Sequence, residues 1–383
     1  MYYIKLFLSI VLGLILIQCS TKNPSAQRNT QSEPVGKYNA KEHFSNMYAN
    51  AGMKYAFNGS SLNDFEKWQK EFRPELKKIL GLDILETQLA TYQPKAQLLS
   101  SEDIGFAIRE RWQIRTEPTV PLPFILLRPK NADHLNVLVI APHGHSKNTE
   151  LYAGIYNSEE ERLSGEEGER NVAIQAVKEG YLAIAPTTRG FGETRTPEDK
   201  ERDAKSSCRT LLLHDLLVGR TPIGDRVWDV SKLIDWALEN LPVDPGKIVV
   251  TGNSGGGTVT LFAAACDTRI SVAVPSSYFC TFTGSIGSLH HCECNYVPGM
   301  MQLGEMADVA GLIAPRAFCA VHGQLDKIFP VDETQKAFED LKQIYMAAGV
   351  PENCELYVGD GGHRYYKDGV WPFVKKHLAK DKD

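Results

Sequence analysis

Apolar residues recur along this chain with two different spacings. Over residues 61–82 they return every three or four positions, which is the period of an amphipathic helix. The apolar positions of this helix are Phe65, Trp68, Phe72, Leu76, Ile79 and Leu80. Asn63 and Asp64 are expected to cap its start. Later short runs predict strands over 108–116, 121–128, 136–141, 181–186, 247–251, 270–275, 317–322 and 355–358, and all but the first of them are mostly apolar.

From residue 136 onward these strands alternate with helical patterns. The predicted helices cover residues 171–179, 225–240, 332–348 and 370–378. Such alternation favours an α/β fold, in which a mostly parallel central sheet is covered by helices on both faces. The first two strands are expected to form an antiparallel edge. We predict one catalytic domain over residues 41–383, with the helix at 61–82 as an N-terminal extension.

The first forty residues are not expected to belong to that domain. Lys5 precedes an apolar run over 6–17, which is short for a bilayer span and typical of a signal peptide. The run ends at Gln18-Cys19, which resembles a bacterial lipobox. We therefore predict a signal peptide over 1–18, lipidation of Cys19, a polar tether over 19–40, and an exported protein anchored in the periplasm or at the cell surface. An ordinary signal peptide or an uncleaved anchor is the alternative.

Charge and cysteine content narrow the function classes. The formal net charge is −5, so the chain lacks the excess of positive charge that is typical of nucleic-acid-binding proteins. Seven cysteines remain after Cys19, so at least one is unpaired within the chain. Cys266 and Cys319 lie in apolar runs and are expected in the core. One disulfide among Cys280, Cys292 and Cys294 is an open alternative for an exported chain.

A glycine-rich turn follows the predicted strand at 247–251. It has the Gly-x-Ser-x-Gly pattern of a nucleophile elbow, and an apolar helix-like stretch comes directly after it. The glycines at both ends leave room for a sharp turn that presents the serine to solvent. The pattern predicts Ser254 as a nucleophile, and the alternative is a turn that binds a phosphate or nothing. The full motif is Gly252-Asn253-Ser254-Gly255-Gly256.

A serine nucleophile needs a base and a group that orients the base. In this architecture the chain order is nucleophile, acid, histidine. Asp326 follows the predicted strand at 317–322, and His363 follows the strand at 355–358, so both match that order. Asp360 is a rival acid on the same loop as His363. Taken singly, Asp326 could also be a helix N-cap or turn residue, and His363 a surface loop histidine.

An acyl-transfer site also needs hydrogen-bond donors for the developing oxyanion. One is expected from the backbone N–H of Gly255, directly after the nucleophile. The loop after the strand at 136–141 contains His143-Gly144-His145-Ser146, and we predict the backbone N–H of His145 as the second donor. Metal binding by the two histidines is disfavoured because no carboxylate cluster accompanies them.

Three further side chains are candidates for substrate binding. Arg189 follows the strand at 181–186 and is predicted to bind an acidic group, with a purely structural arginine as the alternative. Tyr278 and Tyr296 are candidates to stack on a sugar ring, or are simply packing residues. The segment at 288–296 contains Cys292-Glu293-Cys294 beside two histidines, but it lacks a matching second pair. We therefore predict no metal site and no cofactor.

Together these motifs resemble a known family. The chain looks like an α/β-hydrolase of the acetyl xylan esterase and dienelactone hydrolase-like group, over nearly all of residues 61–378. More closely it resembles esterase-like lipoproteins of bacterial polysaccharide-utilisation systems. The motifs that carry the resemblance are Asp64 to Trp68, His143 to Ser146, Thr188-Arg189-Gly190-Phe191-Gly192, Gly252 to Gly256, His322 to Asp326 and Gly362-His363.

The resemblance implies a serine carboxylester hydrolase that removes acetyl or other small acyl groups from carbohydrate. Its expected partners are a small ester or acylated glycan and, through the lipid anchor, a membrane. A serine peptidase or a methylesterase on the same fold is one alternative. A non-catalytic, glycan-binding lipoprotein is the other.

Overall fold

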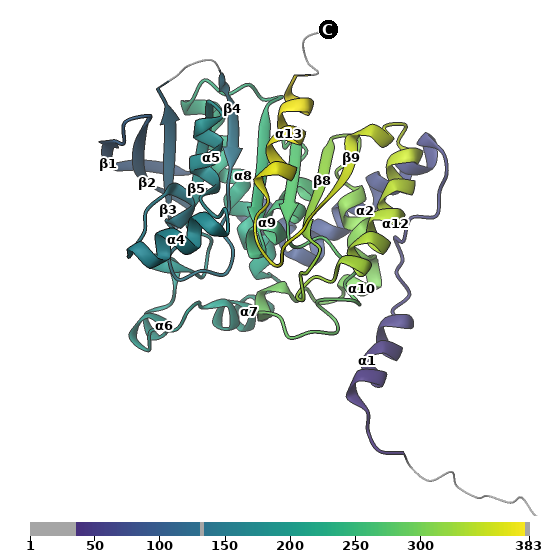
Figure 1. The fold of residues 1–383 in the computed structure, drawn as a ribbon. Coiled ribbons are helices and arrows are strands. Elements are labelled where there is room, and N and C mark those ends of the chain that lie inside the picture. The colour runs from purple at the N-terminus through teal and green to yellow at the C-terminus, as the bar shows by residue number, and fades with distance from the viewer. Residues whose placement is uncertain (1–35, 131–133, 380–383) are drawn as a thin grey trace, which may run out of the picture. The chain divides into compact units, whose positions relative to one another are not determined.

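The central sheet runs through the unit formed by residues 41–383 (Figure 1). A computed structural model describes residues 36–130 and 134–379, and within them nine strands form one sheet in the order β1-β2-β3-β5-β4-β6-β7-β8-β9. The strands from β4 onward are parallel, whereas β1, β2 and β3 pair antiparallel and place β3 antiparallel against β5. The strands are β1 Lys95–Asp103, β2 Ala107–Glu117, β3 Val120–Pro129, β4 His134–Ile140, β5 Tyr181–Pro186, β6 Ile248–Asn253, β7 Val272–Ser276, β8 Ala317–Gly323 and β9 Cys354–Gly359.

Helices cover both faces of this sheet, as the alternating pattern predicts. Neighbouring side chains of β4 separate into two cores, because Leu138 and Ile140 pack in one cluster and Val137 and Val139 in the other. The first core includes side chains of α2 Leu62–Leu80, α3 Leu82–Gln88, α8 Pro222–Asn240, α9 Gly255–Cys266, α10 Met300–Leu303, α11 Met306–Gly311 and α12 Val331–Ala347. The second core includes side chains of α5 Val172–Lys178 and α13 Lys367–Leu378.

The N-terminal helix is shorter than predicted. It ends at Gly81, whose φ of 78° is left-handed, and α3 begins directly after it. The cap is Ser61, not the predicted Asn63 and Asp64 pair. Ser61 Oγ accepts the Asp64 N–H at 3.2 Å, and the Asp64 carboxylate accepts the Ser61 N–H at 3.1 Å. Asp64 therefore contributes as the second half of a capping box.

Several elements have no counterpart in the prediction. Strand β1 is almost entirely exposed, so its sequence does not show the alternation of apolar and polar residues that predicts a strand. Helix α4, Glu159–Glu167, occupies an acidic segment for which no helix is predicted, and Arg162 pairs there with Glu159 and Glu166. Short helices also occur at α1 Ala40–Ala49, α6 Pro197–Glu201 and α7 Cys208–Leu216, with 3-10 turns at η1 Leu151–Ala153, η2 Gly192–Thr194, η3 Glu293–Asn295 and η4 Pro351–Asn353.

The predicted signal peptide, Cys19 and most of the tether lie outside the described residues. Among the residues that are described, no helix combines the length and the apolar character that crossing a membrane requires. The cysteines at 208, 266, 280, 292, 294, 319 and 354 are all free, so the disulfide considered among Cys280, Cys292 and Cys294 is not formed. Cys266 and Cys319 are buried in the core, as predicted.

Candidate active site

Ser254 occupies a strained turn between β6 and α9. Its φ of 57° and ψ of −118° are rarely adopted by a residue with a side chain. Any side chain at Gly252 or Gly256 would collide with the carbonyl oxygen of Pro142. The Ser254 N–H donates to the Ser276 carbonyl at 2.8 Å, which ties the turn to the end of β7. The glycines thus let the turn pack against two neighbouring strand ends.

Asp326 and His363 meet at the ends of β8 and β9. The distance between His363 Nδ1 and Asp326 Oδ2 is 2.8 Å. The other carboxylate oxygen, Oδ1, accepts the backbone N–H groups of Ile328 at 2.8 Å and Phe329 at 3.1 Å. Burial alone would raise the pKa of Asp326, but the hydrogen bond and charge of His363 and these two N–H groups hold it below its usual value. An ionised Asp326 can only accept, so Nδ1 of His363 donates the proton.

Ser254 and His363 line one cavity of about 550 Å³. The His363 ring stacks on Phe329, with centroids 5.9 Å apart. The loop that carries His363 is fixed by Ser277, whose hydroxyl donates to the Arg364 carbonyl at 3.0 Å. Other residues that line the cavity are Gly144, His145, Ser146, Asn148, Leu151, Tyr152, Ser164, Glu167, Gly168, Arg170, Lys205, Asn253, Ile328 and Arg364.

The loop after β4 lies directly against the Ser254 turn. A Cβ on Gly144 would approach the Asn253 carbonyl oxygen to 2.8 Å, and a Cβ on Gly255 would approach His145 Nδ1 to 2.8 Å. Buried His143 holds the loop in place. Its Nε2 accepts the Thr188 N–H at 2.9 Å, and its Nδ1 lies 2.7 Å from the carbonyl oxygen of Gly144. Burial lowers the pKa of His143 to about 4, which keeps the ring neutral. The loop and the turn therefore form one packed unit.

The predicted substrate-binding side chains do not line this cavity. Tyr278 is fully buried and packs against Phe329. Tyr296 is 40% exposed but lines a different cavity, beside Met300 and Met301. Arg189 is buried, and its guanidinium donates to Glu117, Asp225 and Asp229 at 2.5, 2.8 and 2.6 Å. The contacts thus support the structural alternative for Arg189 and the packing alternative for Tyr278, whereas sugar binding by Tyr296 stays a prediction.

Comparison with known proteins places the chain in a family. Residues 35–365 match the model of the Abhydrolase family. The chain belongs to this family. Its fold is that of an α/β-hydrolase, as the sequence predicts.

Individual relatives are distant. A curated protein of Bacillus subtilis (strain 168), named "Putative hydrolase YtaP", is 25% identical over 189 residues, which are 48% of this chain and 60% of that protein. A crystal structure of a "putative acetyl xylan esterase" from Bacteroides fragilis NCTC 9343 is 19% identical, with a TM-score of 0.69 over 89% of this chain and 85% of that one. "Methylesterase BT1017" is 18% identical, with a TM-score of 0.61 over 89% of this chain and 68% of that one.

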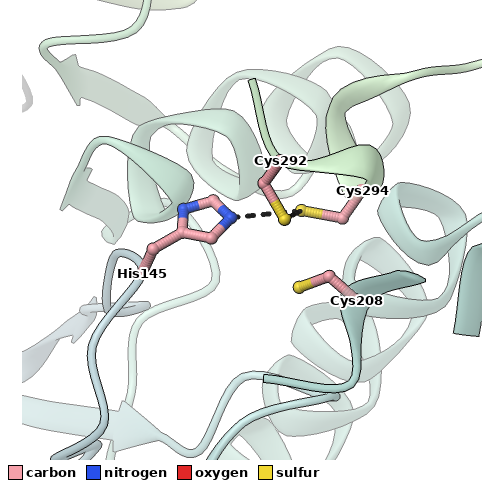
Figure 2. A group of neighbouring side chains, drawn as sticks. All are labelled: His145, Cys208, Cys292 and Cys294. Atoms are coloured by element: carbon pink, nitrogen blue, oxygen red, sulfur yellow. Dashed lines mark hydrogen bonds between the residues drawn. The ribbon is translucent and has the colours of Figure 1, made fainter. Parts of the chain in front are cut away.

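One group near the site was missed from the sequence. His145 lies beside Cys208, Cys292 and Cys294, and the four ligand-type atoms are all within 4.8 Å of one another (Figure 2). The Cys-x-Cys pair does have partners, but they come from segments about 80 and 150 residues away in the chain. Only the unusual Cys292-Glu293-Cys294 spacing signalled the group.

The buried charges around Arg189 give a prediction about the stability of this chain. In Arg189→Met, Glu117, Asp225 and Asp229 lose their shared buried cation, so the free energy of unfolding should fall by about 3–5 kcal/mol. Urea unfolding measures the loss. Arg128→Met, which breaks the partly exposed pair with Glu110, should cost under about 1 kcal/mol. A raised KM with unchanged stability would instead restore Arg189 as a substrate ligand.

Buried His322 should make the fold sensitive to acid. Burial lowers the pKa of His322 to about 4 in the folded chain, whereas its pKa in the unfolded chain is about 6.5. As pH falls from 7 to 5 the unfolded chain takes up this proton first, so His322 should lower the free energy of unfolding by about 2 kcal/mol. In His322→Leu the loss between pH 7 and 5 should shrink by that amount, as measured by urea unfolding at both pH values. His214→Gln, at an exposed position, should leave this loss of stability between pH 7 and 5 unchanged. If His322→Leu loses as much stability as the parent over this range, His322 is not the source of the acid sensitivity.

Proposed function

We propose that the chain is a serine carboxylester hydrolase that uses Ser254, His363 and Asp326 as a catalytic triad. The observation that carries this proposal is the shared cavity of Ser254 and His363, with His363 hydrogen-bonded to the buried carboxylate of Asp326. Membership of the Abhydrolase family supports it. A strained serine at a strand-to-helix turn is the expected setting for such a nucleophile.

In the first step Ser254 Oγ attacks the acyl carbon of the ester, and His363 Nε2 takes the hydroxyl proton. Asp326 keeps Nδ1 protonated, so that Nε2 is free to accept, and it stabilises the imidazolium that forms. The tetrahedral intermediate collapses when His363 returns the proton to the alkoxide that leaves. The alcohol departs, and the acyl group stays on Ser254.

The backbone N–H groups of Gly255 and His145 are proposed to hold the oxyanion in both steps. Support comes from the contact between the two segments, since the His145 ring lies against Gly255 and the Gly144 backbone against Asn253. Water then attacks the acyl-enzyme, with His363 as its base, and the carboxylic acid is released. The net reaction consumes one water and yields one alcohol and one acid, with no external cofactor in the chemistry.

For the substrate we propose an acetyl or other small acyl ester of carbohydrate. The similar structure from Bacteroides fragilis, which is named an acetyl xylan esterase, supports that class by analogy of fold. We likewise retain as a proposal that the protein is exported and anchored through lipidated Cys19, which would expose the site to polymeric substrates outside the cytoplasm.

A second candidate, a methylesterase acting on acidic glycans, is favoured by the charge of the cavity. Arg170, Lys205 and Arg364 line it, against the single carboxylate of Glu167. A partly methyl-esterified uronate polymer carries free carboxylates beside each ester, and these cations would attract them. The name of the methylesterase among the structural neighbours supports this by analogy. A serine peptidase and a non-catalytic glycan-binding lipoprotein remain the further alternatives, without a specific observation in their favour.

Product analysis separates these functions. Acetate and methanol release are measured from a panel of acetylated and methyl-esterified polysaccharides, with a peptide p-nitroanilide as the peptidase control. Acetate without methanol supports the deacetylase, and methanol without acetate replaces it with the methylesterase. If the chain is a methylesterase, Lys205→Gln should raise the KM for uronate polymers and leave p-nitrophenyl acetate hydrolysis unchanged. Absence of turnover, with binding of glycan retained in Ser254→Ala, would favour the non-catalytic alternative.

A further inference from the structure

Three segments that are distant in the sequence bring a histidine and three cysteines together. His145 comes from the loop after β4, Cys208 begins α7, and Cys292 and Cys294 lie at η3. Figure 2 shows the imidazole and the three sulfurs turned toward a common centre. His145 Nε2 lies 3.3 Å from Cys294 Sγ, and Cys294 Sγ lies 3.4 Å from Cys292 Sγ. All four ligand-type atoms lie within 4.8 Å of one another.

These separations fit a tetrahedral metal site better than a disulfide. Bonds of about 2.3 Å to sulfur and about 2.0 Å to nitrogen place tetrahedral ligands about 3.5–3.8 Å apart. A disulfide needs its sulfurs about 2.05 Å apart, well below the 3.4 Å between Cys292 and Cys294. The donor set, three sulfurs and one imidazole nitrogen, is one that structural zinc sites use.

The surroundings suit a bound cation held by thiolates. Cys208 and Cys294 are buried, and the Phe191 and His145 rings lie nearly perpendicular to each other, with their centroids 5.3 Å apart. Buried Arg226 donates to Cys208 Sγ at 3.4 Å. Three thiolates and one divalent cation carry a net charge of −1, which this guanidinium balances. The same guanidinium also donates to the Arg189 carbonyl at 3.1 and 3.0 Å, which holds it beside the sulfurs.

We propose that His145 Nε2 and the thiolate sulfurs of Cys208, Cys292 and Cys294 bind one Zn²⁺. Four protein ligands complete a tetrahedron and leave no open position, so the ion is structural. Binding releases the thiol protons, and the three sulfurs and the imidazole supply all the electron pairs. This proposal revises the sequence-based expectation of no metal.

The ion would join the site to two surface segments. His145 belongs to the loop that packs on the Ser254 turn, and its ring lies against Gly255. Zinc binding by this ring would give the loop a second anchor, in addition to the buried contacts of His143. This consequence rests on the proposed function: His145 is then a positioning residue, and loss of zinc should lower kcat more than it raises KM.

Metal content of the purified full-length chain tests the proposal. We expect about one Zn²⁺ per chain after dialysis, and at least a tenfold loss of bound zinc in Cys292→Ser. Cys354→Ser is the matched control, because this buried cysteine lies outside the group, and it should retain the zinc. Replacement by Co²⁺ in the unmutated chain should give the intense visible bands of tetrahedral thiolate coordination, a readout that does not depend on the folding of any variant.

Two results would overturn the zinc proposal, and they differ from each other. A thiol titration of the metal-free, unfolded chain should recover all three cysteines of the group; loss of two thiols with no bound metal would overturn the proposal in favour of a disulfide. A chain that retains neither Zn²⁺ nor Co²⁺ and recovers every thiol would overturn it as well. Zinc content is read independently of ester turnover, so failure of the proposed function leaves this result intact, and the reverse also holds.

Discussion

Ser254→Ala should lower kcat for ester hydrolysis by about 10⁴- to 10⁶-fold, because without the Ser254 hydroxyl the acyl-enzyme cannot form. The residual rate would come from the proposed oxyanion donors and from substrate binding alone. p-Nitrophenyl acetate gives the rate, and a tryptophan fluorescence unfolding curve verifies that the variant is folded. The change removes one partly buried hydroxyl group, and the unfolding curve separates a loss of catalysis from a loss of folding.

Ser146→Ala is the matched control for that prediction, since Ser146 lines the same cavity. Its kcat should stay within a few-fold of the parent. A third variant, Ser254→Gly, should be inactive yet more stable by about 1 kcal/mol, because glycine adopts the positive φ without strain. Near-parental activity in Ser254→Ala would contradict the nucleophile assignment.

Asp326→Asn should lower kcat by about 10³- to 10⁴-fold, with little change in KM. The amide can donate to Nδ1 of His363, which favours the tautomer whose Nε2 carries the proton and cannot act as a base. The cavity itself keeps its shape, because an amide oxygen can still accept the N–H groups of Ile328 and Phe329. Steady-state kinetics at several pH values measures the effect.

Asp360→Asn is the control for Asp326. Asp360 precedes His363 on the same loop but is exposed, whereas Asp326 is buried and hydrogen-bonded to the ring. Its activity should stay close to that of the parent. A large loss in Asp360→Asn together with an active Asp326→Asn would reverse the two assignments.

The elements that the sequence predicts well are those with a strong local signal. Strands β5, β6 and β8 are buried on both faces, so they appear as mostly apolar runs. The turn at Ser254 needs glycines because the Pro142 carbonyl lies against it, and glycines are visible in a sequence. Asp326 and His363 are brought together because parallel strands end at the same edge of the sheet.

What the sequence misses depends on long-range contacts. Strand β1 is held by pairing with β2, and its exposed side chains leave no periodic apolar signal. Arg189 follows a strand end, where a ligand-binding residue is expected, but three carboxylates from β2 and α8 surround it. The partners of Cys292 and Cys294 come from two other segments, so no local spacing could reveal them.

The most direct test of the central claim is labelling with a fluorophosphonate, followed by peptide mapping. The account predicts one covalent adduct, on the Oγ of Ser254, with loss of ester hydrolysis in proportion to labelling. His363→Ala should slow the labelling strongly, because the hydroxyl then lacks its base. Full ester hydrolysis in a chain that takes no label, or an adduct on any other residue that abolishes activity, would contradict it.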